Sequence, residues 1–257
     1  MQIPKMSRPF ANLERHLYLV IPAAGIGSRM GMADSKQFLE IGGIPVLART
    51  LLSFSEFSAQ TGVHLHAVIV TGEENISRAK ELTAQFRIDF VEKIVEGGAT
   101  RQDSVACGTA ALAELSRVPK NTDIVFIHDG ARCMVDLETI SACYSGGMVY
   151  DVCVAATPCK NTIKMARPSS GDSPAIVDHT LDRSMLYEVQ TPQVFRYGTL
   201  LEVSRKAKEK GITATDDTAL AEALGIPVRL IPCSYGNIKI TTPEDAVLAE
   251  SMIKSRK

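Results

Sequence analysis

The chain has 257 residues and a mass of 27.8 kDa, which suits one large domain or two small ones with a sizeable core. Hydrophobic residues make up 45% and charged residues 22%, which excludes a disordered polyelectrolyte and predicts a folded protein. Basic residues number 28 and acidic residues 29, so no general positive field exists to attract nucleic acid or acidic lipid. Any cationic site must therefore be local.

The cysteines and the first residues indicate where we expect the protein to work. Six cysteines, without a CxxC pair or a zinc-like cluster, predict reduced thiols and a cytoplasmic protein. Residues 1–16 contain no apolar stretch of signal-peptide length, and Glu14 argues against the weak transit-peptide pattern of Ser7 and Arg8. We expect a flexible extension over 1–16, one domain over 17–257, and no membrane span.

Apolar runs alternate along the chain with segments of helical spacing. The runs predict buried strands at 17–21, 65–70, 89–95, 124–127, 149–156 and 228–231. Helical spacing predicts helices at 46–57, 76–86, 104–115 and 137–143, and the TPED sequence at 242–245 begins a last helix that runs to about Ile253. This alternation indicates an α/β fold, a mostly parallel sheet flanked by helices, with ligands beyond the carboxyl ends of its strands.

Residues 158–184 break the alternation. Short extended pieces at 160–164 and 176–181 flank a turn rich in Gly, Pro and Ser at 168–174, a pattern typical of a projecting β-hairpin. A two-stranded hairpin is marginally stable in water by itself. We therefore expect it to pack against another surface, such as a second copy of the chain.

The loop after the first strand, PAAGIGSRM at 22–30, suggests a phosphate site. Its two glycines would let the backbone approach a phosphate, but Met30 replaces the third glycine of a dinucleotide fingerprint, and no P-loop sequence is present. Arg29 and Lys36 could clamp a polyphosphate, which favours a ligand site over a simple tight turn. We expect Lys36 on an open loop, so that Lys36→Ala would lower turnover and leave the melting temperature nearly unchanged.

Two further segments follow predicted strands. The sequence GGATRQDS at 97–104 opens a helix whose free amides and Ser104 could meet a base or a phosphate; a capped helix with an exposed arginine is the alternative. The sequence IHDGAR at 127–132 places Asp129 and Arg132 at the binding edge or in a surface ion pair. His128 is either a general base or a buried histidine with satisfied hydrogen bonds.

No nucleophilic triad can be assembled from the sequence. Arg183, Thr191 and Lys239, taken one by one, could all be solvated. The absence of a triad is informative if the nucleophile is itself a phosphate, which is largely dianionic at neutral pH and needs no base. Catalysis would then rest on alignment, a metal ion and cations.

Eight segments stand in the order of one known family: PAAGIGSRM with SKQF, GGATRQDSV, HDGAR, NTIK, LDR, QTPQVF, ATDD and GNIKITTPEDAVLAE. From about Tyr18 to Ile253, the chain resembles the 2-C-methyl-D-erythritol 4-phosphate cytidylyltransferases of non-mevalonate isoprenoid synthesis. The resemblance implies a Rossmann-like nucleotidyltransferase fold and a homodimer joined through a β-arm at about 157–183. It also implies transfer of the cytidylyl group of CTP to the sugar-alcohol phosphate, with release of pyrophosphate.

The resemblance also implies roles for single residues. Catalytic cations would be Arg29, Lys36 and Lys239, and Mg²⁺ would be held mainly by the CTP phosphates with Asp129 as a possible ligand. The CTP pocket would comprise Ala23, Ala24, Gly25, Gly27, Gly98, Ala99, Ser104, Asp129 and Gly130. The acceptor pocket would comprise Asp129, Arg132, Thr162, Arg183, Thr191, Thr215 and Lys239, with Thr162 and Arg183 reaching from the arm into the partner's site.

Two residues depart from the family pattern, and three alternative functions stay open. The family usually has alanine in place of Gly130 and often an acidic or polar residue in place of Ala99, and we expect both positions to act through their backbone. The alternatives are a ribulose 5-phosphate cytidylyltransferase of teichoic acid synthesis, a non-catalytic sugar-nucleotide-binding protein and a nicotinamide dehydrogenase. Met30 disfavours the last of these.

Overall fold

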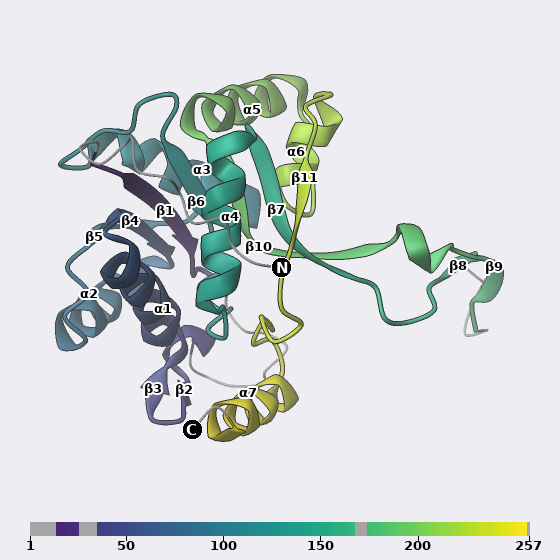
Figure 1. The fold of residues 1–257 in the computed structure, drawn as a ribbon, viewed down its shortest axis with the longest axis horizontal. Helices are drawn as coiled ribbons and strands as arrows, with labels where there is room; N and C mark the ends of the chain where they lie inside the picture. Colours follow the sequence, from purple (N-terminus) through teal and green to yellow (C-terminus); the bar gives the residue numbers. More distant parts are fainter. Residues whose placement is uncertain (1–13, 26–34, 168–173, 256–257) are drawn as a thin grey trace.

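The computed structural model describes residues 14–25, 35–167 and 174–255. A seven-stranded sheet with the order β11-β7-β10-β6-β1-β4-β5 lies at its centre (Figure 1). All neighbouring strands are parallel except β10, which runs antiparallel to both β6 and β7. The strands are β1 (His16–Pro22), β4 (His64–Thr71), β5 (Val91–Glu96), β6 (Ile124–Ile127), β7 (Val152–Pro158), β10 (Tyr187–Arg196) and β11 (Arg229–Pro232).

Helices cover both faces of the sheet. On one face lie α1 (Val46–Thr61), α2 (Ile76–Gln85) and α4 (Leu137–Val149); on the other lie α3 (Arg101–Ala111), α5 (Tyr197–Lys210) and α6 (Asp217–Ala223). Alternate residues of β1 enter the two cores: Leu19 packs in the first and Val20 in the second. Because both faces are buried, the strand is a continuous apolar run rather than an alternating one.

A smaller cluster supports the end of the chain. Helix α7 (Pro243–Ser255) packs through Ala249 with Ile41 of the short hairpin β2 (Glu40–Ile41) and β3 (Ile44–Pro45). Ile240, just ahead of α7, is fully buried in the same cluster, and its amide donates to the carbonyl of Ala131 at 2.8 Å. This contact fixes the segment that carries Lys239 beside the end of β6.

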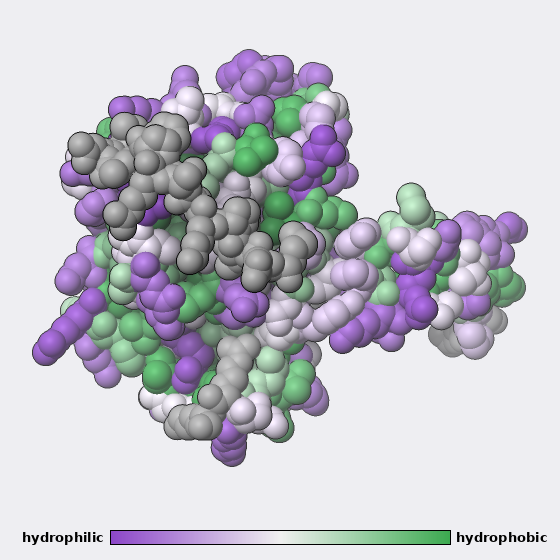
Figure 2. All heavy atoms as spheres, in the orientation of Figure 1, coloured by the Kyte–Doolittle hydropathy of each residue, from purple (hydrophilic) through white to green (hydrophobic). Residues whose placement is uncertain are grey.

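A hairpin arm projects from the domain (Figure 1). It consists of β8 (Lys164–Arg167) and β9 (Ile176–Thr180), and every residue of both strands is exposed. Figure 2 shows apolar side chains interspersed with polar ones on it. The predicted hairpin is therefore present, although its first strand begins at Lys164, the last residue of the extended piece expected at 160–164.

The predicted strands and helices are present, with two corrections. The strand expected at 149–156 is β7, which begins only at Val152, because α4 continues to Val149 rather than ending near Cys143. Gly146 and Gly147 lie inside the continued part of α4. A Cβ on either would come within 2.8 Å of a sheet side chain, so the glycines let the helix pack closely.

Strand β10 and helices α5 and α6 have no counterpart among the predicted elements. Pro192 is atypical of a strand inside a sheet, and the pairing of β10 with β7 shifts register between Val189 and Gln193. For these reasons the sequence pattern did not predict β10. Helix α5 buries Leu200, Val203 and Ala207 among charged neighbours, a sparse pattern whose spacing could have revealed it.

The cysteines are all free thiols, as expected. Within the described ranges, no helix has both the length and the apolar character needed to cross a membrane.

Candidate active site

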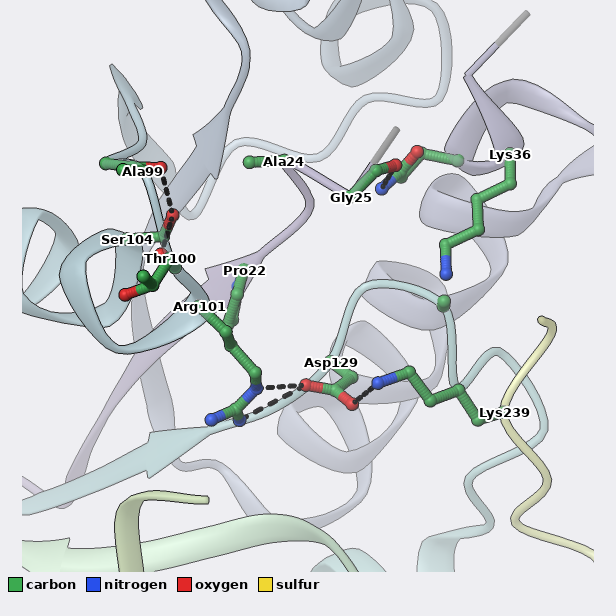
Figure 3. Close-up of a pocket in the computed structure, with 13 residues that line it drawn as sticks. Pro22, Ala24, Gly25, Lys36, Ala99, Thr100, Arg101, Ser104, Asp129 and Lys239 are labelled. Carbon is green, nitrogen blue, oxygen red and sulfur yellow. Dashed lines mark hydrogen bonds and ion pairs between the residues drawn. The ribbon is translucent and has the colours of Figure 1, made fainter. Parts of the chain in front are cut away.

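A cavity of about 380 Å³ opens beyond the carboxyl ends of the central strands (Figure 3). It lies between the loop after β1, the start of α3, the loop after β6 and the segment ahead of α7. Ten of its lining residues are labelled in Figure 3: Pro22, Ala24, Gly25, Lys36, Ala99, Thr100, Arg101, Ser104, Asp129 and Lys239. The site thus lies at the edge that the predicted α/β fold favours for ligands.

One wall is built by two glycines that allow close packing against α3. A Cβ on Gly98 would stand 2.3 Å from the Cβ of Asp103, and one on Gly97 would stand 2.7 Å from the hydroxyl of Ser104. Thr100 and Asp103 form a capping box, in which the Asp103 amide donates to the Thr100 hydroxyl at 3.0 Å. The expectation of free amides is therefore wrong for Asp103, because its amide already has a partner.

Ser104 keeps the capacity to accept a hydrogen bond. Its hydroxyl donates to the Thr100 carbonyl at 2.9 Å, with the Gly98 carbonyl as a longer second acceptor at 3.4 Å, which commits its only hydrogen. The oxygen lone pairs remain, and the carbonyls of this turn are also acceptors. Acceptors are what the exocyclic amine of cytosine requires.

Asp129 lies at the centre of the cationic part of the site. Its Oδ2 lies 2.7 Å from Lys239 Nζ, and its Oδ1 accepts from Arg101 Nε at 3.2 Å (Figure 3). Burial alone would raise the pKa of this carboxyl, but the charges of Arg101 and Lys239 outweigh burial and hold the pKa well below its ordinary value. Asp129 is therefore ionised at neutral pH, and it is no surface ion pair, since only 7% of the residue is exposed.

Arg101 is the main residue that sequence reasoning missed. It was expected to be an exposed arginine, yet it connects Asp129 with Asp217 of α6, whose Oδ2 lies 2.6 Å from Arg101 Nη1. Both carboxylates are buried, which explains why the arginine turns inward. A charge-bearing residue directly after a helix cap was the available signal, but the sequence alone could not identify its partners.

Lys36 is also placed differently from the expectation of an open loop. It begins the short 3₁₀ helix η2 (Lys36–Phe38), and only 9% of the residue is exposed. Its Nζ would lie 3.9 Å from a Cβ added to Gly25, so the ammonium stands beside this glycine. The carbonyl of Gly25 also accepts from Gln37 Nε2 at 3.3 Å, which holds the loop and η2 together.

His128 is the buried histidine and not a general base. Thr191 Oγ1 stands 3.1 Å from its Nδ1, its Nε2 lies 3.3 Å from the Arg132 carbonyl, and the residue is fully buried. Burial lowers its pKa to about 4, so the ring is neutral near pH 7. Thr191 is buried rather than solvated, and its hydroxyl accepts from the Asp129 amide at 3.1 Å.

The other predicted residues surround the cavity or lie away from it. Ala23 and Gly130 are buried behind it, and a Cβ on Gly130 would stand 3.2 Å from that of Ala23, which leaves little room for the alanine usual at this position. Arg132 donates to the Asn237 carbonyl at 2.8 Å. Thr215 is exposed ahead of α6.

Among the predicted residues that the structure describes, those that do not line the cavity are Ala23, Gly130, Arg132, Thr162, Arg183, Thr191 and Thr215. Thr162 and Arg183 are exposed at the base of the arm, where Arg183 donates to the carbonyl of Lys160 at 2.9 Å. Gly27 and Arg29 lie outside the described residues. The cavity therefore combines most of the predicted nucleotide pocket with Lys36, Asp129 and Lys239, and with Arg101 in addition.

Comparison with known proteins gives one consistent result. The family model described as IspD, 2-C-methyl-D-erythritol 4-phosphate cytidylyltransferase, matches residues 17–255. A protein of that name from Pelotomaculum thermopropionicum is 42% identical over 92% of this chain and 94% of its own length. Its counterpart from Geobacillus kaustophilus is 40% identical over 92% of this chain and 96% of its own length.

Solved structures agree with the sequence relatives. The 4-diphosphocytidyl-2C-methyl-D-erythritol synthase of Anaerococcus prevotii superposes with a TM-score of 0.74 at 26% identity, over 93% of this chain and 96% of its own. The cytidylyltransferase of Thermus thermophilus superposes with a TM-score of 0.68 at 28% identity, over 94% of this chain and 100% of its own. The chain therefore belongs to the IspD family of 2-C-methyl-D-erythritol 4-phosphate cytidylyltransferases.

Proposed function

We propose how the cavity around Asp129 divides the work of this family's reaction among its residues. The chain is a CTP-dependent cytidylyltransferase. It transfers the cytidylyl group of CTP to 2-C-methyl-D-erythritol 4-phosphate and forms 4-diphosphocytidyl-2-C-methyl-D-erythritol. An oxygen of the acceptor phosphate bonds to the α-phosphorus, the bond from that phosphorus to the bridging oxygen breaks, and pyrophosphate leaves.

The single observation that carries the division of labour is that two lysines line the same part of one cavity (Figure 3). Lys36 stands against the glycine loop after β1, and Lys239 stands beside Asp129 (Figure 3). Lys36 stabilises the negative charge that develops on the phosphates of CTP, together with Arg29 of the same loop sequence. Lys239 faces the acceptor phosphate, and Asp129 holds Lys239 in place.

The base end of CTP lies in the opposite part of the cavity. Gly98, Ala99 and Ser104 offer backbone groups and a hydroxyl oxygen, and these acceptors suit the exocyclic amine of cytosine. Gly98 cannot carry a side chain without displacing α3, so the backbone itself forms this wall. This arrangement fixes the nucleotide before the acceptor phosphate aligns with it.

The residues present fit a magnesium ion that is carried mainly by the nucleotide. Over the described part of the chain, no group of three His, Cys, Asp or Glu side chains could hold a metal alone. Asp129 is an ionised carboxylate at the cavity, and one carboxylate together with substrate phosphates is a usual Mg²⁺ environment. When bound, the ion would neutralise phosphate charge. Asp129 would supply its protein ligand.

The arm supports a homodimer in which each site is completed by the partner. Seven large apolar residues on or near the arm are exposed, among them Met185 at 76% and Ile176 at 68%. An isolated two-stranded hairpin with such a surface is marginally stable in water. Thr162 and Arg183 lie at the base of this arm, so docking it on a second copy would bring them toward that copy's acceptor pocket.

A pyrophosphate-release assay tests the reaction. The protein, CTP and Mg²⁺ are mixed with 2-C-methyl-D-erythritol 4-phosphate or with ribulose 5-phosphate, and each mixture is repeated with excess EDTA. We expect release with the first acceptor only, and none after chelation. Release with ribulose 5-phosphate alone would establish the alternative, which the comparisons do not support. CTP binding without turnover of either acceptor would indicate a nucleotide sensor, and activity in EDTA would refute the role of the metal.

A mixing experiment tests the shared site. Lys36→Met impairs the cavity of its own chain, and Arg183→Ala impairs the cavity of the partner. Because a mixed dimer contains one site with neither defect, mixing the two inactive variants should restore part of the activity. No recovery, or a monomer in light scattering, would contradict the dimeric site.

A further inference from the structure

Gln102 makes a contact that the nucleotide pocket does not require. It lies on the first turn of α3, one residue after Arg101, and its side chain turns toward the segment ahead of α6. Its Nε2 donates to the carbonyl of Ile212 at 3.1 Å, and its Oε1 accepts from the amide of Ala214 at 3.4 Å. One carboxamide thus binds the backbone on both sides of Thr213.

The far end of this segment is also fixed. Asp216 caps α6 by accepting from the amides of Thr218 and Ala219 at 2.9 and 3.0 Å. The amide of Asp217 donates to Gln193 Oε1 of β10 at 2.9 Å, and its carboxylate accepts from Arg101. Residues 212–217, named here the α6 loop, are therefore held at both ends.

Thr215 lies between these two anchors. It is exposed while Asp217 and Thr218, which follow it, are buried. A residue at such a position takes its place from the backbone on either side of it. On its amino-terminal side, the carboxamide of Gln102 provides the side-chain hydrogen bonds to residues 212–214 and serves as the anchor.

Among described residues, the side chain of Gln102 bonds to the α6 loop alone, whereas Arg101 and Ser104 of α3 line the nucleotide pocket. Thr100, Arg101 and Ser104 line the cavity, and Arg101 also contacts Asp129, so changing any of them would disturb the nucleotide pocket directly. Gln102 does not line that cavity. Its hydrogen bonds connect the rigid start of α3 with the α6 loop and with nothing in the nucleotide pocket.

We propose that Gln102 is a positioning residue for the acceptor: its carboxamide sets the place of Thr215, and through Thr215 the affinity for the sugar-alcohol phosphate. The proposal rests on the proposed function and on the sequence resemblance that assigns Thr215 to the acceptor; in the structure, the ion pair of Asp217 with Arg101, a residue that lines the cavity, holds the α6 loop beside it. Nucleotide binding does not depend on Gln102. The first turn of α3 thereby serves both substrates, with separate side chains for each.

The first experiment separates the two substrates. Gln102→Met keeps the length of the side chain and removes both hydrogen bonds, and Gln85→Met makes the same change at an exposed position of α2. We expect Gln102→Met to raise the KM for 2-C-methyl-D-erythritol 4-phosphate about tenfold, which corresponds to one net hydrogen bond. The KM for CTP should stay within about twofold, and Gln85→Met should change neither constant.

The second experiment asks whether the effect passes through Thr215. Thr215→Val removes the hydroxyl and keeps the shape of the side chain. If Gln102 acts through Thr215, Gln102→Met should raise the acceptor KM much less in the Thr215→Val background than in the wild type. Independent effects would multiply instead.

Several outcomes would overturn the proposal. These are an unchanged acceptor KM, equal increases in both KM values, or fully multiplicative effects in the double variant. Should Gln102→Met fold poorly, Gln102→Glu provides the same test, because its carboxylate can accept from Ala214 but cannot donate to Ile212. A wild type that releases no pyrophosphate would refute the proposed function; an active wild type with an unaffected Gln102→Met would refute this inference alone.

Discussion

His128 should make the protein's stability depend on pH in a range where exposed carboxylates contribute little. The folded protein lowers the pKa of this histidine from 6.5 to about 4, chiefly because the ring is fully buried. An unfolded chain would bind a proton near pH 6.5, and the folded chain binds it only near pH 4. The stability that comes from keeping the ring neutral is therefore complete above pH 6.5 and is lost as the pH falls from 6.5 to 4.

The size of the effect follows from that difference. Each unit of pKa corresponds to about 1.4 kcal/mol, so the folded protein should lose about 3 kcal/mol over this range from His128 alone. Burial is the reason; within the fold, the Nδ1 of His128 faces the hydroxyl of Thr191, which in turn accepts from the amide of Asp129. Protonation would place a positive charge on this fully buried ring, whose hydrogen-bond partners are a hydroxyl and a carbonyl and not a carboxylate.

Urea unfolding at a series of pH values measures this loss. The variant His128→Gln keeps a neutral hydrogen-bonding side chain and should flatten the curve between pH 6.5 and pH 4, whatever it costs at pH 7.5. His179→Gln, on the exposed β9, is the matched control and should follow the wild type. If His128→Gln loses as much stability as the wild type over this range, the buried neutral ring is not the cause.

Three further substitutions test the cavity. Lys36→Met should lower kcat about 100-fold or more, because the cation faces developing phosphate charge. The apolar stem that methionine retains should keep the melting temperature within a few degrees. A large fall in melting temperature with normal kcat would show that Lys36 is structural. Gly98→Ala should destabilise the fold by about 1–3 kcal/mol and raise the KM for CTP, since its Cβ would meet Asp103 at 2.3 Å; unchanged values in thermal unfolding and kinetics would contradict this packing. Lys239→Met removes a charge that lowers the pKa of Asp129, so this pKa should rise toward its ordinary value and the acidic limb of the pH–rate profile should move to higher pH. An unmoved limb would show that Lys239 does not control this carboxylate.

The sequence could predict what depends on local pattern and could not predict what depends on contacts between distant segments. Apolar runs located β1, β4 and β6, and the glycine loops located the cavity at the sheet edge. The inward turn of Arg101 depends on Asp217, which lies 116 positions further along the chain. No spacing rule connects two such residues, so the arginine was expected to be solvated.

Burial caused the other differences from expectation. Lys36 follows a glycine-rich sequence and was expected in the open, but it lies in η2, is buried and stands beside Gly25. The helix expected to end near Cys143 continues because Gly146 and Gly147 pack against Ile231 and Val194, which come from distant strands. In each case, the determining contact is tertiary and has no signature near the residue itself.

Strand β10 has a consequence for how the arm can change in evolution. Its first three residues are exposed beside the arm, and the next six are buried in the sheet, so one strand passes from the arm into the core and carries Thr191 to Asp129. Inserting one residue between Tyr187 and Val189 would turn every side chain on the arm side of the insertion to the opposite face. Inserting two would restore the faces but displace the arm by about 7 Å. Changes in arm length are therefore more easily accepted in the hairpin than in the strand that leads to it.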